Sequence, residues 1–373
     1  MTTAIPAEGR VDLRIGWDGR AVRHAVVRSR RPQPGSLLVG RSSEHAKLVI
    51  PRLYSLCGDA QSVATEALDA VLRSNGPDGE RVADWAERLR LENIREHLWR
   101  LGLDWPGFLG DAQQAGPLRE LLGARNRFAA DRRAAAEWAD TTFQNLFGRK
   151  HLAWLDDDPD PESLERWLND APTSLAVLLA RLQPRLTGLG LSRLPLFRAE
   201  DLDPMVDALL PRLRSDPDFH WRPDWGGQVF EMGPLARQAT HPLVAAMLKR
   251  QPGPDSWLRV LARVLELGLA LHSLANRLPA THALVWKPGD GEAVVGLEMV
   301  RGVLLHWVRF GPQGIRDYRI VAPTEWNFHP EGPALEGLLQ LQADSEESLR
   351  EAVTLQVMAL DPCVDYELEI VHA

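Results

Sequence analysis

The chain has 373 residues, of which 45% are hydrophobic and 25% are charged, a composition typical of a soluble globular protein. Its formal net charge of −8 at pH 7 argues against nucleic acid or an anionic membrane surface as the main partner. No apolar run approaches the roughly 18–20 residues of a membrane span, and the N-terminus lacks the layout of a signal peptide. With only two cysteines there is no disulfide framework, so we expect a protein of the reducing cytoplasm.

The N-terminal region, residues 1–41, is expected to form a β hairpin. Residues 10–30, RVDLRIGWDGRAVRHAVVRSR, contain apolar runs that alternate with polar residues on both sides of Asp18-Gly19. An Asp-Gly pair between two such runs is the strongest short signal for a hairpin turn.

Residues 42–278 are expected to form a helical body, because apolar residues there recur at helical spacing. Residues 116–150 and 160–193 are rich in Ala, Leu and Arg. Residues 255–278 are apolar nearly all round and begin with Asp255-Ser256, either of which is a candidate N-cap. This last segment is therefore predicted to be a central core helix.

The pattern changes to a period of two within residues 285–330, which predicts two strands, a Gly-Pro-Gln-Gly turn and a third strand. The C-terminal region, residues 344–373, is expected to contain a helix and then a short tail. Asp344 and Glu347 resemble a capping box at the start of that helix, and Pro362 would end it.

The two cysteines, Cys57 and Cys363, lie near opposite ends of the chain. A lone cysteine is usually a small residue of the hydrophobic core. A disulfide between them requires the chain ends to meet and is opposed by a reducing cytoplasm. Neither a C-x-x-C pair nor a histidine at ligand spacing supports zinc. Spacing alone leaves a cysteine nucleophile open, although no local signature supports one. Composition and periodicity thus leave the function open.

The residues around the two cysteines carry more information. PRLYSLCGDAQ, residues 51–61, and DPCVDYELE, residues 361–369, resemble degraded copies of the paired cysteine motifs of [NiFe]-hydrogenase large subunits. In that family, an R-x-C-G-x-C-x-x-x-H box and a D-P-C-x-x-C-x-x-H box supply four thiolates. Soft thiolate sulfur suits low-valent iron and nickel.

Three further segments resemble the same family, in the family's order: residues 34–52, which lead into the first box, the GPLAR pentapeptide at 233–237, and residues 296–328. The last segment resembles the family's E-A-P-R-G sequence and the P-T-x-W-N that follows it. The resemblance reaches over nearly the whole chain. It implies a mainly helical α+β fold of the hydrogenase large-subunit type, with a central helical bundle and small antiparallel sheet or hairpin regions, in a single domain over 1–373.

The family also implies two contacts to the iron. Its arginine in the E-A-P-R-G segment and the Ser or Thr after the proline contact the cyanide ligands of the iron. The matching residues here are Arg301 and Thr324, the latter directly after Pro323. A guanidinium and a hydroxyl are both suitable hydrogen-bond donors to a cyanide nitrogen.

The departures from the family pattern concern the ligand positions. Tyr54 stands where the first cysteine belongs, Gln61 replaces the histidine of the first box, and Tyr366 replaces the second cysteine of the C-terminal box. Only Cys57, which would bridge the two metals, and Cys363, which would be a terminal nickel ligand, remain. Two thiolates do not reproduce a four-sulfur nickel site, so we expect no nickel.

This combination resembles the HupK/HoxV-type hydrogenase accessory proteins. The resemblance implies a non-catalytic scaffold that receives an Fe(CN)2(CO) fragment from the general maturation complex and passes it to the apo large subunit. The alternative is an assembly chaperone that binds no iron. A working hydrogenase with tyrosine ligands is chemically unfavourable, and retention of the two cysteines argues against the metal-free homologue in NADH:quinone oxidoreductase. The sequence assigns no role to residues 116–220.

Overall fold

The computed structural model describes residues 9–74, 76–148, 155, 161–170, 173–280 and 284–372. The chain divides into two compact units, the first made of Met1–Val82, Leu189–Arg237 and Ala283–Ala373 and the second of Ala83–Gly188 and Gln238–His282. Residues 1–8 of the predicted hairpin region lie outside the described residues. The single domain over 1–373 stays a prediction. Within the described residues, no helix is long and apolar enough to cross a membrane.

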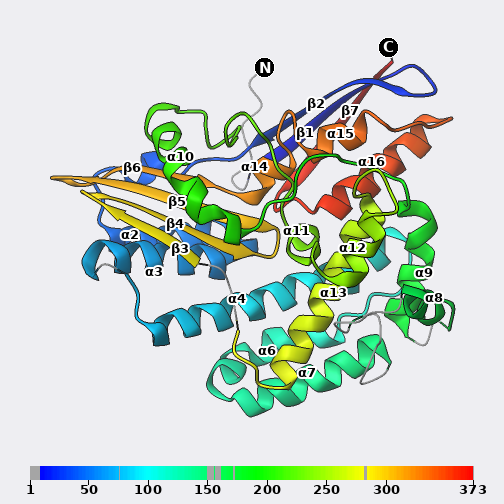
Figure 1. The fold of residues 1–373 in the computed structure, drawn as a ribbon, viewed down its shortest axis with the longest axis horizontal. Helices are drawn as coiled ribbons and strands as arrows, with labels where there is room; N and C mark the ends of the chain where they lie inside the picture. The colour runs from blue at the N-terminus through cyan, green and yellow to red at the C-terminus, as the bar shows by residue number, and fades with distance from the viewer. Residues whose placement is uncertain are drawn as a thin grey trace. The chain divides into compact units, whose positions relative to one another are not determined.

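The first unit contains both sheets and the helices around them (Figure 1). Its elements are β1 (Arg10–Trp17), β2 (Val22–Arg30), α1 (Gly35–Leu38), α2 (Ser43–Leu53), the 3-10 turn η1 (Ser55–Cys57), α3 (Gly58–Ser74), η3 (Ala199–Asp201), α10 (Leu202–Ser215), α11 (Pro234–Gln238), β3 (Leu284–Gly289), β4 (Glu292–Met299), β5 (Gly302–Gly311), β6 (Gly314–Val321), α14 (Pro323–Asn327), α15 (Pro333–Leu338), α16 (Glu346–Leu360) and β7 (Asp365–His372).

The predicted N-terminal hairpin is confirmed. Strands β1 and β2 pair antiparallel, and Asp18 closes the turn by accepting hydrogen bonds from the N–H groups of Arg20 and Ala21. Gly19 adopts φ +91°, which favours glycine. The C-terminal strand β7 pairs parallel with β1 and completes a sheet of order β2-β1-β7.

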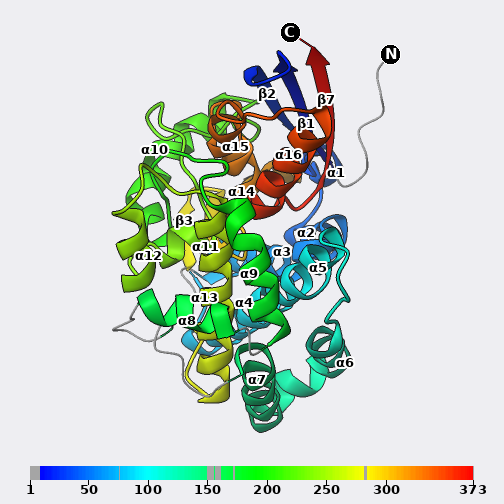
Figure 2. The same cartoon turned by 90° about the vertical axis from the view of Figure 1, so that its right-hand side faces the viewer.

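The inner face of this sheet packs on α15 and α16 (Figure 2). The shared core contains Val11, Leu13 and Ile15 of β1 and Val353 and Val357 of α16. Because β7 pairs with β1, two segments from opposite parts of the sequence, Arg10–Trp17 and Asp365–His372, lie side by side in this sheet.

The second sheet has the order β3-β4-β5-β6 and is antiparallel throughout. Strand β4 is buried along its whole length. Helix α10 packs on this sheet through Leu202, Met205 and Leu209, and α3 contacts β3, β4 and β5. The strands and the turn predicted within 285–330 are therefore confirmed.

The second unit is helical over the part of the chain that the structure describes. Its elements are α4 (Gly79–Trp99), whose first turn belongs to the first unit, the π-helical turn η2 (Arg100–Asp104), α5 (Trp105–Phe108), α6 (Gly116–Ala130), α7 (Arg132–Phe147), α8 (Pro161–Asp170), α9 (Ser174–Leu186), α12 (Pro242–Leu248) and α13 (Ser256–Ala275). The predicted core helix is α13, which is buried over most of its length. Asp255 caps it by accepting a hydrogen bond from the N–H of Leu258 at 2.9 Å.

The predicted capping box at the start of the last helix is wrong by one residue. The N-cap of α16 is Ser345, not Asp344, and its hydroxyl accepts the N–H of Ser348, while the Ser348 hydroxyl accepts the N–H of Ser345. Two serines thus make the reciprocal bonds that Asp344 and Glu347 were expected to make.

Candidate functional site

Arg301 is presented by a tight turn between β4 and β5. Gly302 has φ +128°, and a Cβ atom there would lie 2.5 Å from the Cβ of Met232, so only glycine fits. Arg237, the last residue of the GPLAR pentapeptide, donates hydrogen bonds to the carbonyl oxygens of Met299 and Val300 at 2.8 Å and 2.7 Å. The pentapeptide therefore stabilises the turn that carries Arg301.

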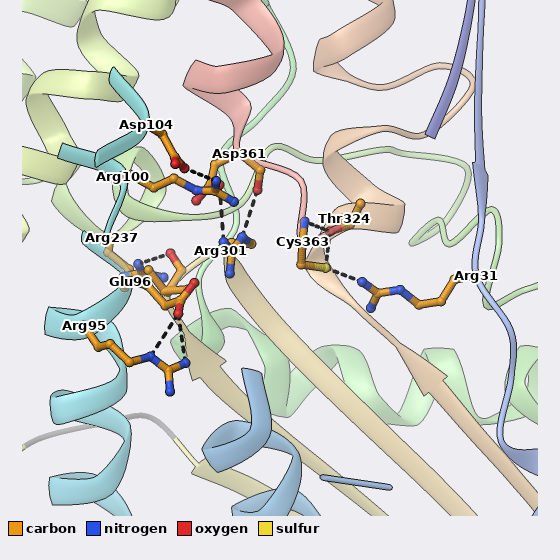
Figure 3. Close-up of polar contacts among 11 residues, drawn as sticks. Arg31, Arg95, Glu96, Arg100, Asp104, Arg237, Arg301, Thr324, Asp361 and Cys363 are labelled. Atoms are coloured by element: carbon orange, nitrogen blue, oxygen red, sulfur yellow. Dashed lines mark hydrogen bonds and ion pairs between the residues drawn. The ribbon is translucent and has the colours of Figure 1, made fainter. Parts of the chain in front are cut away.

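The side chain of Arg301 is buried and holds the segment that precedes Cys363 (Figure 3). Its Nε donates a hydrogen bond to the carbonyl oxygen of Asp361 at 3.0 Å, and Nη2 lies 3.3 Å from Oδ1 of the same residue. Asp361 ends α16 in the left-handed conformation, with φ +58°. Arg301 thus fixes a turn that Pro362 and Cys363 then follow.

Thr324 contacts Cys363 directly. Pro323 occupies the first position of α14, where its missing N–H is no loss, and Thr324 follows it. The Thr324 Oγ1 lies 2.9 Å from the Cys363 Sγ and 3.4 Å from the Cys363 backbone N. Asn327 anchors the same helix by bonding both backbone groups of Met232. The predicted residues Thr324 and Cys363 are therefore neighbours in the fold.

A second cation, Arg31, approaches the same sulfur. Arg31 directly follows β2, is 2% exposed, and donates a hydrogen bond from Nη2 to the Cys363 Sγ. In Figure 3, Arg31 and Arg301 approach the segment Asp361–Cys363 from opposite sides. Burial lowers the pKa of Arg31, but Cys363, Glu325, Cys57 and Tyr54 raise it, and the net effect is upward. Arg31 therefore carries a permanent positive charge.

Glu325 is the acidic partner of this cation. Its carboxylate is 1% exposed, and its Oε1 lies 3.9 Å from the Nε of Arg31 and accepts a hydrogen bond from the Ser29 hydroxyl at 3.2 Å. Burial raises the pKa of Glu325, and Arg31 opposes that rise. A buried charge pair of this kind is costly to maintain, which makes it a candidate for function.

Cys57 ends the 3-10 turn η1 before α3, and it is among the groups that raise the pKa of Arg31. The Gln61 Nε2 lies 3.7 Å from the Cys57 Sγ. Tyr54 places its ring 5.4 Å from the guanidinium carbon of Arg31 and donates its hydroxyl to the carbonyl oxygen of Pro32 at 3.0 Å. Burial raises the pKa of Tyr54 above its usual range, so its phenol is protonated at neutral pH.

The structure does not bring Tyr366 to this cluster. Tyr366 lies on β7, and its hydroxyl lies 2.8 Å from the Thr354 Oγ1 of α16. Neither cysteine forms a disulfide, although both are buried. The remaining predicted residues other than Pro323 are all buried, as are Arg31 and Glu325. We call these eight residues the thiol cluster: Arg31, Tyr54, Cys57, Gln61, Arg301, Thr324, Glu325 and Cys363.

The thiol cluster offers few metal ligands and many hydrogen-bond donors. Among the described residues, no group of three or more His, Cys, Asp or Glu side chains is arranged to hold a metal ion. The Arg31 Nη1 is buried and has no hydrogen-bond partner within the described chain. Two sulfurs and several hydrogen-bond donors could hold only a metal that brings most of its own ligands.

The sequence reasoning missed Arg31 and Glu325. Arg31 is one of three arginines in the stretch Arg28–Arg31, and its partner Cys363 lies 332 residues further along the chain. Glu325 has a local signal, because an acidic residue sits among buried apolar residues in PTEWNF. A buried carboxylate requires a cation, and this rule would have prompted a search for one.

Two solved hydrogenase structures share this fold. An [NiFeSe] hydrogenase from Desulfomicrobium baculatum aligns with a TM-score of 0.59 at 15% identity over 93% of this chain and 94% of that chain. The reduced enzyme from Desulfovibrio vulgaris Hildenborough gives a TM-score of 0.54 at 16% identity over the same shares. Residues 273–365 also match the family of nickel-dependent hydrogenases. The fold is therefore that of the hydrogenase large subunits.

Relatives that match the chain over nearly its whole length identify its family within this fold. The chain is 31% identical over its whole length to the hydrogenase expression/formation protein HoxV of Cupriavidus necator, of which it covers 98%. It is 31% identical over 98% of its length to HupK of Azotobacter vinelandii, and 29% over 96% to HupK of Rhizobium leguminosarum bv. viciae. The chain belongs to the HoxV/HupK family of hydrogenase expression/formation proteins.

Proposed function

We propose that this protein is a non-catalytic scaffold of hydrogenase maturation, which transiently carries an Fe(CN)2(CO) fragment. Its source would be the general maturation complex, and its acceptor the apo large subunit of a [NiFe] hydrogenase. The hand-over would take place in the cytoplasm, where thiols stay reduced. The names of the relatives support a role in hydrogenase formation.

The observation that carries the proposal is the pairing of two buried thiols with donors that suit cyanide. Cys363 contacts the Thr324 hydroxyl and the Arg31 guanidinium, and Arg301 holds the adjoining turn. The fragment brings three ligands of its own, so two thiolates complete a five-coordinate iron. Charge-assisted hydrogen bonds to cyanide nitrogens would then contribute about 1.5–3 kcal/mol each in this buried setting.

The small number of thiol ligands that this protein offers also favours release of the iron fragment. A scaffold with two thiols offers the fragment fewer candidate donors than a large subunit with four, which would favour transfer to that subunit. Tyr54, which occupies a ligand position of the enzyme family, keeps its proton and makes a poor ligand for a soft metal. Both features support transfer in one direction and argue against hydrogen chemistry at this site.

Infrared spectroscopy tests the proposal. The protein, purified anaerobically from cells that contain the maturation machinery, should show cyanide and carbonyl stretching bands, with bound iron and without nickel. Cys57→Ser and Cys363→Ser should each remove the bands, while thermal melting confirms that each variant is folded.

Two outcomes would oppose this account. Bands that persist in both cysteine variants would show that the thiols do not hold the iron. A wild-type protein that forms its complex with the large subunit but never carries iron would instead be the assembly chaperone that the sequence left open.

A further inference from the structure

The two arginines of the thiol cluster, Arg31 and Arg301, differ in their hydrogen-bond partners. Arg301 donates hydrogen bonds from two of its nitrogens to the backbone carbonyl and the side chain of Asp361. Among the described residues, the Arg31 side chain donates a hydrogen bond to the Cys363 sulfur, and its Nε lies 3.9 Å from the Glu325 carboxylate. Its Nη1 and Nε are buried and have no hydrogen-bond partner within the described residues. Arg31 therefore holds a positive charge and a spare donor directly beside a candidate ligand.

A positive charge at this place has opposite effects on two kinds of metal. A bare divalent cation bound to Cys363 would lie within a few ångströms of the guanidinium, and like charges repel strongly away from water. It would also need about four donors, which the described residues do not supply. A divalent iron with two cyanides is formally neutral, and its cyanide nitrogens accept hydrogen bonds from guanidinium N–H groups.

We propose that Arg31 makes the thiol cluster selective: it admits a metal that carries anionic ligands and repels bare divalent cations such as Ni²⁺. The identity of the admitted metal rests on the proposed function, whereas the rejection of Ni²⁺ does not. Arginine suits this task better than lysine would at a buried site, because its charge persists there. The apo protein can thus keep two thiols together in a cell that contains nickel.

Ni²⁺ binding to the apo protein tests this inference. The protein is purified anaerobically from cells without the maturation machinery, and Ni²⁺ is titrated in competition with a coloured chelator. Arg31→Met removes the charge at similar volume, and Arg31→Lys replaces the guanidinium by an ammonium, whose charge is lost more readily at a buried site. Arg30→Met is the matched control, because this neighbouring arginine is 40% exposed and pairs with Asp12.

Loss of the charge should raise the Ni²⁺ affinity of Arg31→Met by about tenfold or more. Arg30→Met should stay within about twofold of wild type, and Arg31→Lys should lie between wild type and Arg31→Met, because a buried ammonium loses its charge more readily than a guanidinium. The gain should disappear when Cys363→Ser is added to Arg31→Met, which shows that the new site uses this sulfur. Unchanged affinity in folded Arg31→Met, or a gain that survives Cys363→Ser, would overturn the inference.

A second measurement does not depend on the folding of Arg31→Met. In the wild-type background, Cys363→Ser should leave Ni²⁺ affinity unchanged, because the sulfur does not take part. A loss of about tenfold would show that wild type already binds Ni²⁺ there, against the inference. Failure of the scaffold role is seen separately, as missing cyanide and carbonyl bands in protein from maturation-competent cells.

Discussion

The buried pair of Arg31 and Glu325 allows a prediction of both size and sign. Arg31→Met and Glu325→Gln each remove one charge while nearly conserving volume, and the double variant removes both. Together with wild type they form a double-mutant cycle, which isolates the interaction between the two side chains.

The structure sets the expected magnitude. The Arg31 Nε and the Glu325 Oε1 are 3.9 Å apart, and their side chains are 3% and 1% exposed. Opposite unit charges at that distance attract by about 4 kcal/mol at an effective dielectric constant of 20. Each single variant should therefore lose about 2 kcal/mol of unfolding free energy, and the double variant should lie within about 1 kcal/mol of wild type. The coupling energy should be about 3 kcal/mol.

Urea unfolding of the four apo proteins at pH 8 measures this coupling. Repeating the cycle at lower pH should give a smaller value. Burial raises the pKa of Glu325, so that carboxylate takes up a proton more readily than an exposed one. A coupling energy below about 0.5 kcal/mol at pH 8 would refute the view that the two groups interact as charges.

Three further variants test other side chains of the structure. Thr324→Val should lower the unfolding free energy by about 1–2 kcal/mol and shift the cyanide bands, since it removes the hydroxyl 2.9 Å from the Cys363 Sγ. Thr354→Val, which removes a hydroxyl bonded to Tyr366, should leave the bands in place, and equal shifts in both would count against a specific role. His306 is buried, which lowers its pKa from 6.5 to about 3. The folded state therefore holds it neutral, so stability is complete above pH 6.5 and falls as pH drops toward 3, by up to about 1.4 kcal/mol per pH unit. Urea unfolding of His306→Gln should show a flatter pH dependence, and an unchanged slope would contradict this reading.

Local patterns were sufficient for most elements. The hairpin at Asp18-Gly19, the capped core helix from Asp255 and the strands within 285–330 each follow from a signal carried by adjacent residues. Strand β7 was not predicted, although Tyr366, Leu368 and Ile370 alternate with polar residues. Its partner β1 lies at the other end of the chain, and no local pattern identifies a partner so distant.

The candidate site likewise contains residues that the sequence predicted and residues that it did not. Cys57, Cys363, Arg301 and Thr324 were identified because they stand in motifs of a known family. Arg31 belongs to none of those motifs, and its contact with Cys363 exists only because β2 and the end of α16 are brought together by folding. The residues that distinguish this site are therefore the ones that needed the structure.

The carrier role is tested most directly by the hand-over itself. Iron-loaded protein is incubated with the apo large subunit, the two are separated, and the infrared spectrum and iron content of each are measured. The cyanide and carbonyl bands should leave this protein and appear in the large subunit with a matching amount of iron. Bands that stay on this protein, or equal loading of the large subunit by the Cys57→Ser/Cys363→Ser double variant, would contradict the carrier role.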